Sequence, residues 1–148
     1  PVEVPTHNAG VIEFHNGALI TATISFDVHS HQHHNIEIYG TEGSISVPDP
    51  NSFNGDVKTF RPQTREWRSM GFTHGYKENS RSIGAADLAY GVRTGRAHRC
   101  SGELAYHALE VMSAFEKSSL TNAPAVLAST CTQPAALPLG LPEGMLDE

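Results

Sequence analysis

The clearest alternation of apolar and polar residues along the chain lies in residues 36–50. Isoleucine or valine occupies every second position on both sides of a short polar connection, Thr41-Glu42. This period of two predicts a β-hairpin, and the glycines that flank the connection suit a tight turn. Pro48 and Pro50 should end the second strand, because proline cannot donate a hydrogen bond to a ladder.

A second alternation fills residues 18–28, directly after Asn16-Gly17, which is a strong hairpin signal. One side of this stretch is rich in threonine and serine, and the other side is apolar, as in an antiparallel sheet with one covered face. Residues 57–60 and 66–70 predict two more strands, with Trp67 packed on the sheet. We expect the apolar side of the 18–28 strand to lie under helices: Ile20, Ala22, Ile24, Phe26 and Val28.

After residue 71 the spacing of apolar residues becomes helical. It predicts one helix over residues 82–94, ended by Gly95, and a second that begins after an N-cap at Ser101 with Glu103 in its first turn. A short strand at 125–128 and a proline-rich tail after residue 133 complete the chain. The expected buried stripe of the second helix is Leu104, Ala108, Met112 and Phe115. Strands followed by helices predict a single α+β domain over residues 1–148, with a mainly antiparallel open sheet and helices packed on one face.

Composition narrows the class of protein. The 148 residues are 39% hydrophobic and carry a net charge of −6, which argues against a nucleic-acid partner. No apolar run has the length of a membrane span. The one basic cluster, Arg93, Arg96, His98 and Arg99, follows a predicted helix and is interpreted as stabilising that helix end. Two cysteines without C-x-x-C spacing indicate a reducing, cytoplasmic setting, and a start at Pro1 suggests a processed product or a piece of a longer protein.

Two features carry candidate chemistry. His29, His31 and His33 recur at every second position of the run D-V-H-S-H-Q-H-H, so an extended chain would place them on one side, where they could ligate Zn²⁺ or Ni²⁺. The competing interpretation is a solvated polar connection. Asp87, on a mostly apolar helix face, is interpreted as a structural carboxylate paired with Arg81 or Arg93.

The ordered set of segments resembles a known family. The order is F-H-N-G-A, T-A-T-I-S-F-D, I-E-I-Y-G-T-E-G-S-I-S-V-P-D-P, R-S-I-G-A-A-D-L-A-Y-G-V-R-T-G-R-A-H-R and S-G-E-L-A-Y-H-A-L-E-V-M-S-A-F. Over residues 6–138 it is similar to the second half of the C-terminal domain of Gfo/Idh/MocA oxidoreductases. The resemblance implies a two-domain enzyme that transfers a hydride at a hydroxyl carbon of a sugar, polyol or related substrate. An N-terminal Rossmann domain would bind NAD or NADP, and the C-terminal sheet would complete the substrate pocket and form the oligomer interface.

The resemblance also assigns roles within this chain. His31, Gln32 and His33 would hydrogen-bond and orient the substrate, because neutral imidazole both donates and accepts. The family's acid–base residues and its glycine fingerprint precede the matching segment, so no catalytic or cofactor-binding residue is expected here, and the isolated fragment is expected to be inactive. The expected partners are the missing Rossmann domain, a second copy of the chain and a small-molecule substrate. The alternative function is a stand-alone β-rich module that binds metal through the His29–His34 run.

Overall fold

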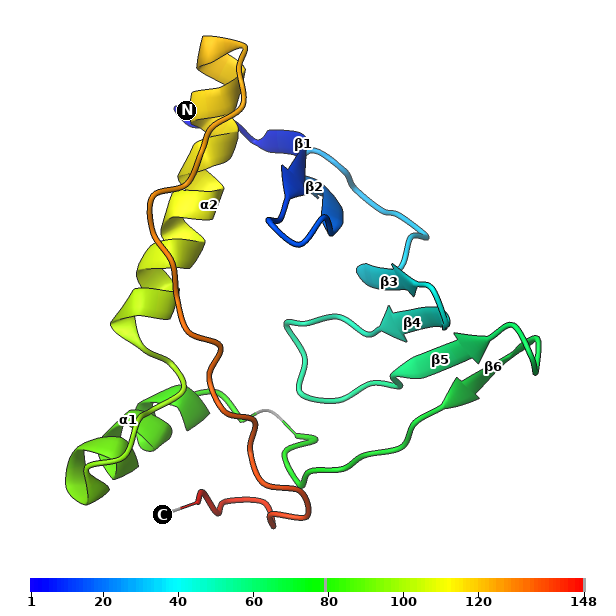
Figure 1. Ribbon diagram of the computed structural model, residues 1–148, viewed down its shortest axis with the longest axis vertical. Coiled ribbons are helices and arrows are strands. Elements are labelled where there is room, and N and C mark those ends of the chain that lie inside the picture. Colours follow the sequence, from blue (N-terminus) through cyan, green and yellow to red (C-terminus); the bar gives the residue numbers. More distant parts are fainter. Residues whose placement is uncertain (79, 148) are drawn as a thin grey trace. The chain divides into compact units, whose positions relative to one another are not determined.

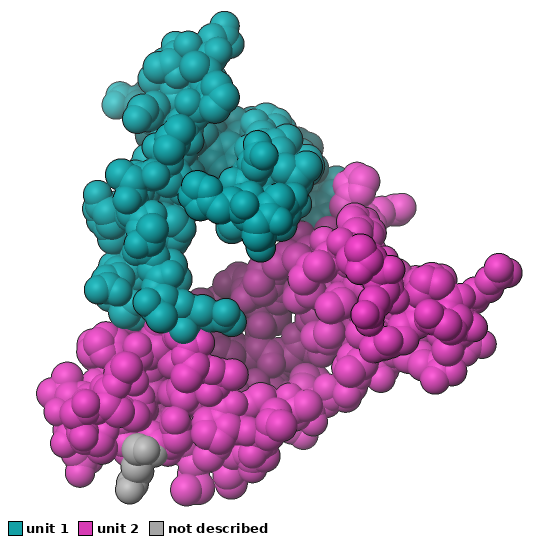
Figure 2. Space-filling view, viewed as in Figure 1, with its two compact units in different colours: residues 1–31, 101–133 teal, residues 32–100, 134–148 magenta. Residues whose placement is uncertain are grey.

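The computed structural model of the chain describes residues 1–78 and 80–147 (Figure 1). These residues form six strands and two helices, divided between two compact units (Figure 2). Unit 1 comprises residues 1–31 and 101–133, and unit 2 comprises residues 32–100 and 134–148. Each unit therefore combines segments that are far apart in the sequence, and each is described below by itself.

The first hairpin and one helix build unit 1. Strands β1 (His7–Glu13) and β2 (Leu19–Ser25) pair antiparallel, with Gly10 opposite Ala22. The turn between them contains Gly17 at a φ of 85°, a value that glycine adopts without strain. The hairpin predicted from the Asn-Gly signal is confirmed.

Helix α2 (Gly102–Thr121) begins as its sequence predicts. The Ser101 Oγ accepts a hydrogen bond from the Leu104 backbone N–H at 3.2 Å, and Glu103 lies in the first turn. The helix packs against β1, and its Phe115 ring lies over Gly10. A Cβ atom at Gly10 would stand 2.9 Å from the ring, so the absence of a side chain there lets the helix approach the strand.

The rotation of α2 about its axis differs from the predicted stripe. Ala108 is exposed and Met112 is 60% exposed, so these two expected core positions are wrong. The cause is an extended segment, residues 124–131, which runs beside α2 and is bound by polar helix side chains (Figure 1). A pattern of hydrophobic residues does not record those polar contacts. It therefore predicts a buried face that is rotated about the helix axis relative to the observed one. The face that is half-buried consists of Leu104, His107, Glu110, Val111, Ala114, Phe115 and Ser118.

The apolar side of β2 is also less covered than predicted. Ala22 is half-buried, but Ile20 is 45% exposed and Ile24 is 54% exposed. Phe26 and Val28 lie beyond the end of β2 and are 89% and 53% exposed. The expected burial under helices is therefore wrong, because the single helix of unit 1 packs on β1 rather than on β2.

Replacing Phe115 by alanine is expected to destabilise unit 1 by about 2 kcal/mol, below the range for a fully buried phenylalanine, because the ring is only half-buried. Urea denaturation followed by far-UV circular dichroism measures the loss. Met112→Ala, on the exposed side of the same helix, is the matched control and should change stability by less than about 0.5 kcal/mol. Equal losses from the two variants would contradict the observed rotation of the helix.

The central hairpin and the next two strands form the sheet of unit 2. Its four strands follow each other in chain order and pair antiparallel throughout. They are β3 (Ile36–Gly40), β4 (Gly43–Val47), β5 (Lys58–Arg61) and β6 (Glu66–Ser69). All four strands were predicted. Trp67 faces its cross-strand partner Phe60 with ring centroids 5.6 Å apart, although it remains 46% exposed.

Helix α1 (Ile83–Thr94) ends at Gly95, as predicted, where a φ of 75° lets the Gly95 N–H donate to the Gly91 carbonyl at 2.9 Å. The helix packs on no strand of the described chain. Its Gly91 instead lies against the turn that follows it, because a Cβ there would stand 3.1 Å from the Cβ of His98. The expectation that both helices pack on one sheet therefore does not hold for α1.

The proline-rich end of the chain belongs to unit 2. Residues 134–147, called here the C-terminal strap, contain Leu146, the one large apolar residue that is buried among the described residues, with 9% exposure. The predicted strand at 125–128 is extended but joins no ladder in the part of the chain that the structure describes.

The predicted α+β class, with open antiparallel sheets and two helices, is confirmed. The strands form a two-stranded and a four-stranded sheet rather than one. Within residues 1–78 and 80–147, neither α1 nor α2 combines the length with the apolar character that a bilayer-spanning helix needs.

Candidate functional site

The histidine run is an irregular, exposed connection between β2 and β3. His31 ends the first segment of unit 1, and Gln32 and His33 are the first residues of unit 2. None of these three side chains makes a hydrogen bond within the described chain, so their donors and acceptors point to solvent. His34 differs, because its Nδ1 lies 3.4 Å from the Oγ of the buried Ser46.

The metal interpretation finds no geometric support. Among the described residues, no three His, Cys, Asp or Glu side chains gather as metal ligands would, and this includes His29, His31 and His33. The metal role of His29, His31 and His33 therefore stays a prediction that no cluster of ligands in the described chain supports.

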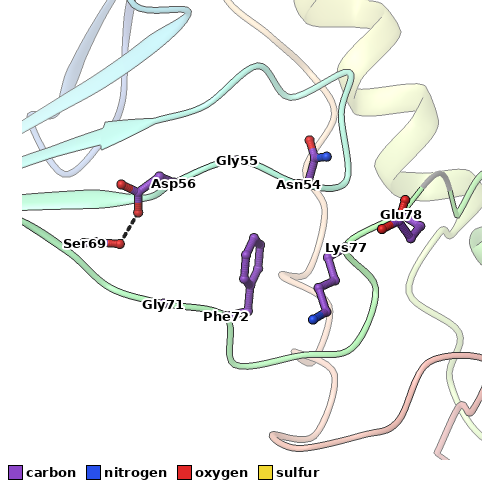
Figure 3. A pocket seen from close by; sticks show the side chains of 8 residues that line it. All are labelled: Asn54, Gly55, Asp56, Ser69, Gly71, Phe72, Lys77 and Glu78. Atoms are coloured by element: carbon purple, nitrogen blue, oxygen red, sulfur yellow. Dashed lines mark hydrogen bonds between the residues drawn. The ribbon is translucent and has the colours of Figure 1, made fainter.

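An open pocket of about 670 Å³ lies in unit 2 (Figure 3). The segment that precedes β5 forms one side, and the chain that follows β6 forms the other. Its lining residues are Asn54, Gly55, Asp56, Ser69, Gly71, Phe72, Lys77 and Glu78. The Phe72 ring is 58% exposed and extends into the space between the two segments (Figure 3).

The pocket combines an apolar platform with groups that bind hydroxyls. The Lys77 Nζ lies 6.0 Å from the centre of the Phe72 ring, and the Asp56 carboxylate accepts a hydrogen bond from Ser69 (Figure 3). Asn54 and Glu78 add an amide and a second carboxylate. An aromatic face surrounded by a few polar groups is the composition expected of a small-molecule site.

A cluster of two arginines and two aspartates joins α1 to the C-terminal strap. Asp87 is 2% exposed, and its carboxylate accepts hydrogen bonds from the Arg96 Nη2 at 2.8 Å, the Arg99 Nη1 at 2.8 Å and the Arg99 backbone N–H at 2.6 Å. Both Nη atoms of Arg99 also donate hydrogen bonds to the Asp147 carboxylate, at 2.9 and 2.8 Å.

The cluster corrects two sequence interpretations. Asp87 is a satisfied structural carboxylate, but it pairs with Arg96 and Arg99 rather than with Arg81 or Arg93. Correspondingly, Arg96 and Arg99 serve as ion-pair partners and not only as favourable charges after a helix.

Both carboxylates of the cluster are held in their charged form. Burial alone would raise the pKa of Asp87, but the hydrogen bonds from the Arg99 N–H and the two guanidinium groups outweigh it, so this pKa lies below its ordinary value. The bidentate hydrogen bond from Arg99 likewise lowers the pKa of Asp147.

Unit 1 has a polar cluster of its own, between α2 and the extended segment 124–131. Glu110 accepts hydrogen bonds from the Ala128 N–H at 2.9 Å and from both the N–H and the hydroxyl of Ser129, and these bonds lower its pKa to about 2. The His107 Nδ1 lies 2.8 Å from the Ser129 Oγ. A catalytic triad places the imidazole between the serine and the acid. Here the acid contacts the serine directly, so the cluster tethers the segment to the helix.

The loop before α1 contributes to the pocket through Phe72, Lys77 and Glu78. His74 and Tyr76 instead bind strap carbonyls, those of Leu137 and Met145. Sequence analysis missed Phe72, Lys77 and Glu78, because no periodicity or motif marks a site made of loop residues.

Comparisons with known proteins agree with this architecture. No curated protein and no solved structure shows a significant match to the chain. The sequence model of the family described as "Oxidoreductase family, C-terminal alpha/beta domain" matches residues 6–127, which is most of the chain and includes all six strands and both helices. The chain therefore belongs to the Gfo/Idh/MocA oxidoreductase family and carries that family's C-terminal α/β domain.

Proposed function

We propose that this chain acts as the substrate-binding and assembly part of an NAD(P)-dependent oxidoreductase whose substrate is a sugar, a polyol or a related hydroxylated compound. The observation that carries the proposal is the match of residues 6–127 to the C-terminal domain of an oxidoreductase family. In this arrangement residues 1–148 form a single functional domain that works beside a separate dinucleotide-binding domain.

The described residues do not fit a dinucleotide. A Rossmann site needs parallel strands and a glycine-rich turn that runs from a strand into a helix. Every strand pair described here is antiparallel, and the one helix that comes after a strand, α1, is separated from β6 by residues 70–82 rather than by a tight glycine-rich turn. The dinucleotide is therefore assigned to the partner domain, and no step of its chemistry is assigned to this chain.

Substrate binding is assigned to groups that are exposed and able to bind hydroxyls. His31, Gln32 and His33 are exposed, and their polar atoms make no hydrogen bond within the described chain. Imidazole and amide groups both donate and accept, which suits a substrate with several hydroxyl groups. These side chains would orient the substrate rather than transfer its proton. No observation favours the alternative of a stand-alone metal-binding module.

Calorimetric titration of the chain with NAD and with NADP should show no binding of either dinucleotide. The protein encoded by the open reading frame that contains the chain should reduce NAD or NADP in the presence of one or more members of a panel of sugars and polyols. In that protein, His31→Ala combined with His33→Ala should raise KM by about tenfold, equivalent to the loss of roughly one or two hydrogen bonds, and leave kcat nearly unchanged.

His15→Ala, a change of the same kind in the turn between β1 and β2, is the control and should leave KM unchanged. Micromolar binding of a dinucleotide by the chain alone would contradict the assignment of the cofactor. A full protein that oxidises no member of the panel would contradict the proposed activity.

A further inference from the structure

The strap is bonded along its length to the loop that forms one wall of the pocket. The Gly140 N–H donates to the Thr73 carbonyl at 3.1 Å, and the Gly75 N–H donates to the Leu141 carbonyl at 3.3 Å. The other two residues of this loop section bind the strap through their side chains. The His74 Nε2 lies 3.0 Å from the Leu137 carbonyl oxygen, and the Tyr76 hydroxyl donates to the Met145 carbonyl.

Each of residues 73–76 is thus hydrogen-bonded to the strap, and Phe72, Lys77 and Glu78 on either side line the pocket. The loop belongs to no ladder in the described chain, and its one internal backbone bond runs from the Lys77 N–H to the Gly75 carbonyl at 2.9 Å. The strap is therefore the main support of this wall of the pocket.

The strap is in turn fixed to the turn after α1 by two arginines, mainly by Arg99. Arg99 donates to the carbonyls of Ala135 and Ala136 at 2.9 and 3.2 Å, near the start of the strap, and to the Asp147 carboxylate at its end. The Arg96 Nε donates to the Asp147 carbonyl at 3.1 Å. Both ends of the strap are therefore held on the arginine pair.

The two aspartates of this cluster are not equivalent. The side chain of Asp87 is 3% exposed, whereas that of Asp147 is 27% exposed and lies on the strap. If Asp147 left the cluster, Asp87 would still bind both guanidinium groups. The buried ion pairs of Asp87 with Arg96 and Arg99 therefore do not require the strap.

We propose that the C-terminal strap is a detachable latch that sets the position of the pocket wall, with Asp147 as its positioning residue. The latch is closed by the ion pairs between the Asp147 carboxylate and the guanidinium groups of Arg96 and Arg99. Residues 72–78 are held in place when the Asp147 carboxylate binds Arg96 and Arg99, and they become mobile when it does not. The width of the pocket therefore depends on an ion pair that lies outside the pocket. This inference concerns the chain's own loop and does not depend on the proposed substrate.

Hydrogen–deuterium exchange of the full chain tests the latch without any ligand. Asp147→Asn removes the charge and one half of the bidentate bond with little change of shape. The amides of Gly75 and Gly140 should then exchange roughly tenfold faster or more, because they sit in the strap–loop bonds, while the ladder amides of β4 and β5 should exchange as before. Asp147→Glu, which restores the carboxylate, should recover most of the protection.

Glu143→Gln is the matched control. Glu143 lies on the strap, carries the same charge and has no side-chain hydrogen bond or ion pair in the described chain, so its replacement should change nothing. Unchanged exchange at Gly75 in Asp147→Asn would overturn the proposal. So would an equal increase across the whole of unit 2, because that would make Asp147 a contributor to global stability only.

Discussion

Replacing Asp87 by alanine is expected to lower the free energy of unfolding of unit 2 by about 3–5 kcal/mol, the range for removing one partner of a buried ion pair. The side chain is 2% exposed and receives three hydrogen bonds from Arg96 and Arg99. Without it, the Arg96 Nη2 and the Arg99 backbone N–H would lose an acceptor, and two guanidinium groups would share one carboxylate, that of Asp147. Urea denaturation followed by the fluorescence of Trp67, which lies in the same unit, measures the change.

Glu42→Ala is the control for the loss of Asp87. Glu42 also pairs with an arginine of unit 2, Arg61, but the pair is 3.9 Å apart and the Glu42 side chain is 88% exposed. An exposed pair of this kind contributes about 0–1 kcal/mol, so the control should remain close to the parent protein. A loss below about 1 kcal/mol for Asp87→Ala would mean that the cluster does not hold unit 2 together.

The same cluster gives unit 2 a defined response to acid. The pKa values of Asp87 and Asp147 are lowered on folding, so the unfolded chain binds protons more readily than the folded one. Their stabilising effect is complete above the ordinary aspartate pKa of about 3.9, and it disappears as the pH falls through the lower folded-state values. Asp87→Asn should therefore weaken the dependence of stability on pH in this acidic range.

The elements that the sequence predicted correctly are those determined by neighbouring residues. Two hairpins follow from alternation around a short turn, and one end of each helix follows from a local cap, Gly95 after α1 and Ser101 before α2. In each case the turn or cap that defines the element connects residues only a few positions apart. Sequence patterns record interactions of this range directly.

The features that were mispredicted depend on distant or polar partners. Asp87 is bound by Arg99, after the end of its helix, and by way of Arg99 it is linked to Asp147 at the end of the strap. The rotation of α2 is set by Glu110, whose carboxylate binds two backbone N–H groups 18 and 19 residues away. The charge and hydrophobicity of residues along the chain do not identify such partners. From the sequence, an arginine that pairs with a buried carboxylate cannot be told apart from an arginine in solvent.

In the candidate site, too, the sequence identified residues that are adjacent in the chain and missed those that only the fold brings together. His31, Gln32 and His33 could be named from the sequence because they form a dense run, and their role stays a prediction. The pocket could not be named, because it joins the segment before β5 to the loop after β6 and depends on the strap for its second wall. A site made from three loops has no spacing rule that a sequence could reveal.

One surface of unit 1 is suited to self-association. The face of the β1–β2 hairpin opposite Phe115, called here the hairpin outer face, bears Ala9, Val11, Leu19, Thr21 and Thr23. Val11 and Leu19 are each 66% exposed, and Glu13 is the one carboxylate on this face. Such a face is too poor in charge for an ordinary solvated sheet and resembles the core of an interface.

We expect two copies of the chain to associate through the hairpin outer face. Packing of two such faces across a two-fold axis would give a dimer, the commonest assembly, and a specific contact should bury more than about 1,000 Å² in total. Thr21→Lys combined with Thr23→Lys would place like charges near each other across the axis. The repulsion should cost several kcal/mol, which corresponds to a rise in the dimer Kd of about a hundredfold or more.

Sedimentation at micromolar concentration measures the change in the dimer Kd. The control variant, Ser113→Lys with Ser119→Lys on exposed positions of α2, adds the same charge away from this face. A parent chain that is monomeric in this range, or a Thr21→Lys/Thr23→Lys variant that dimerises as tightly as the parent, would exclude this surface as the interface.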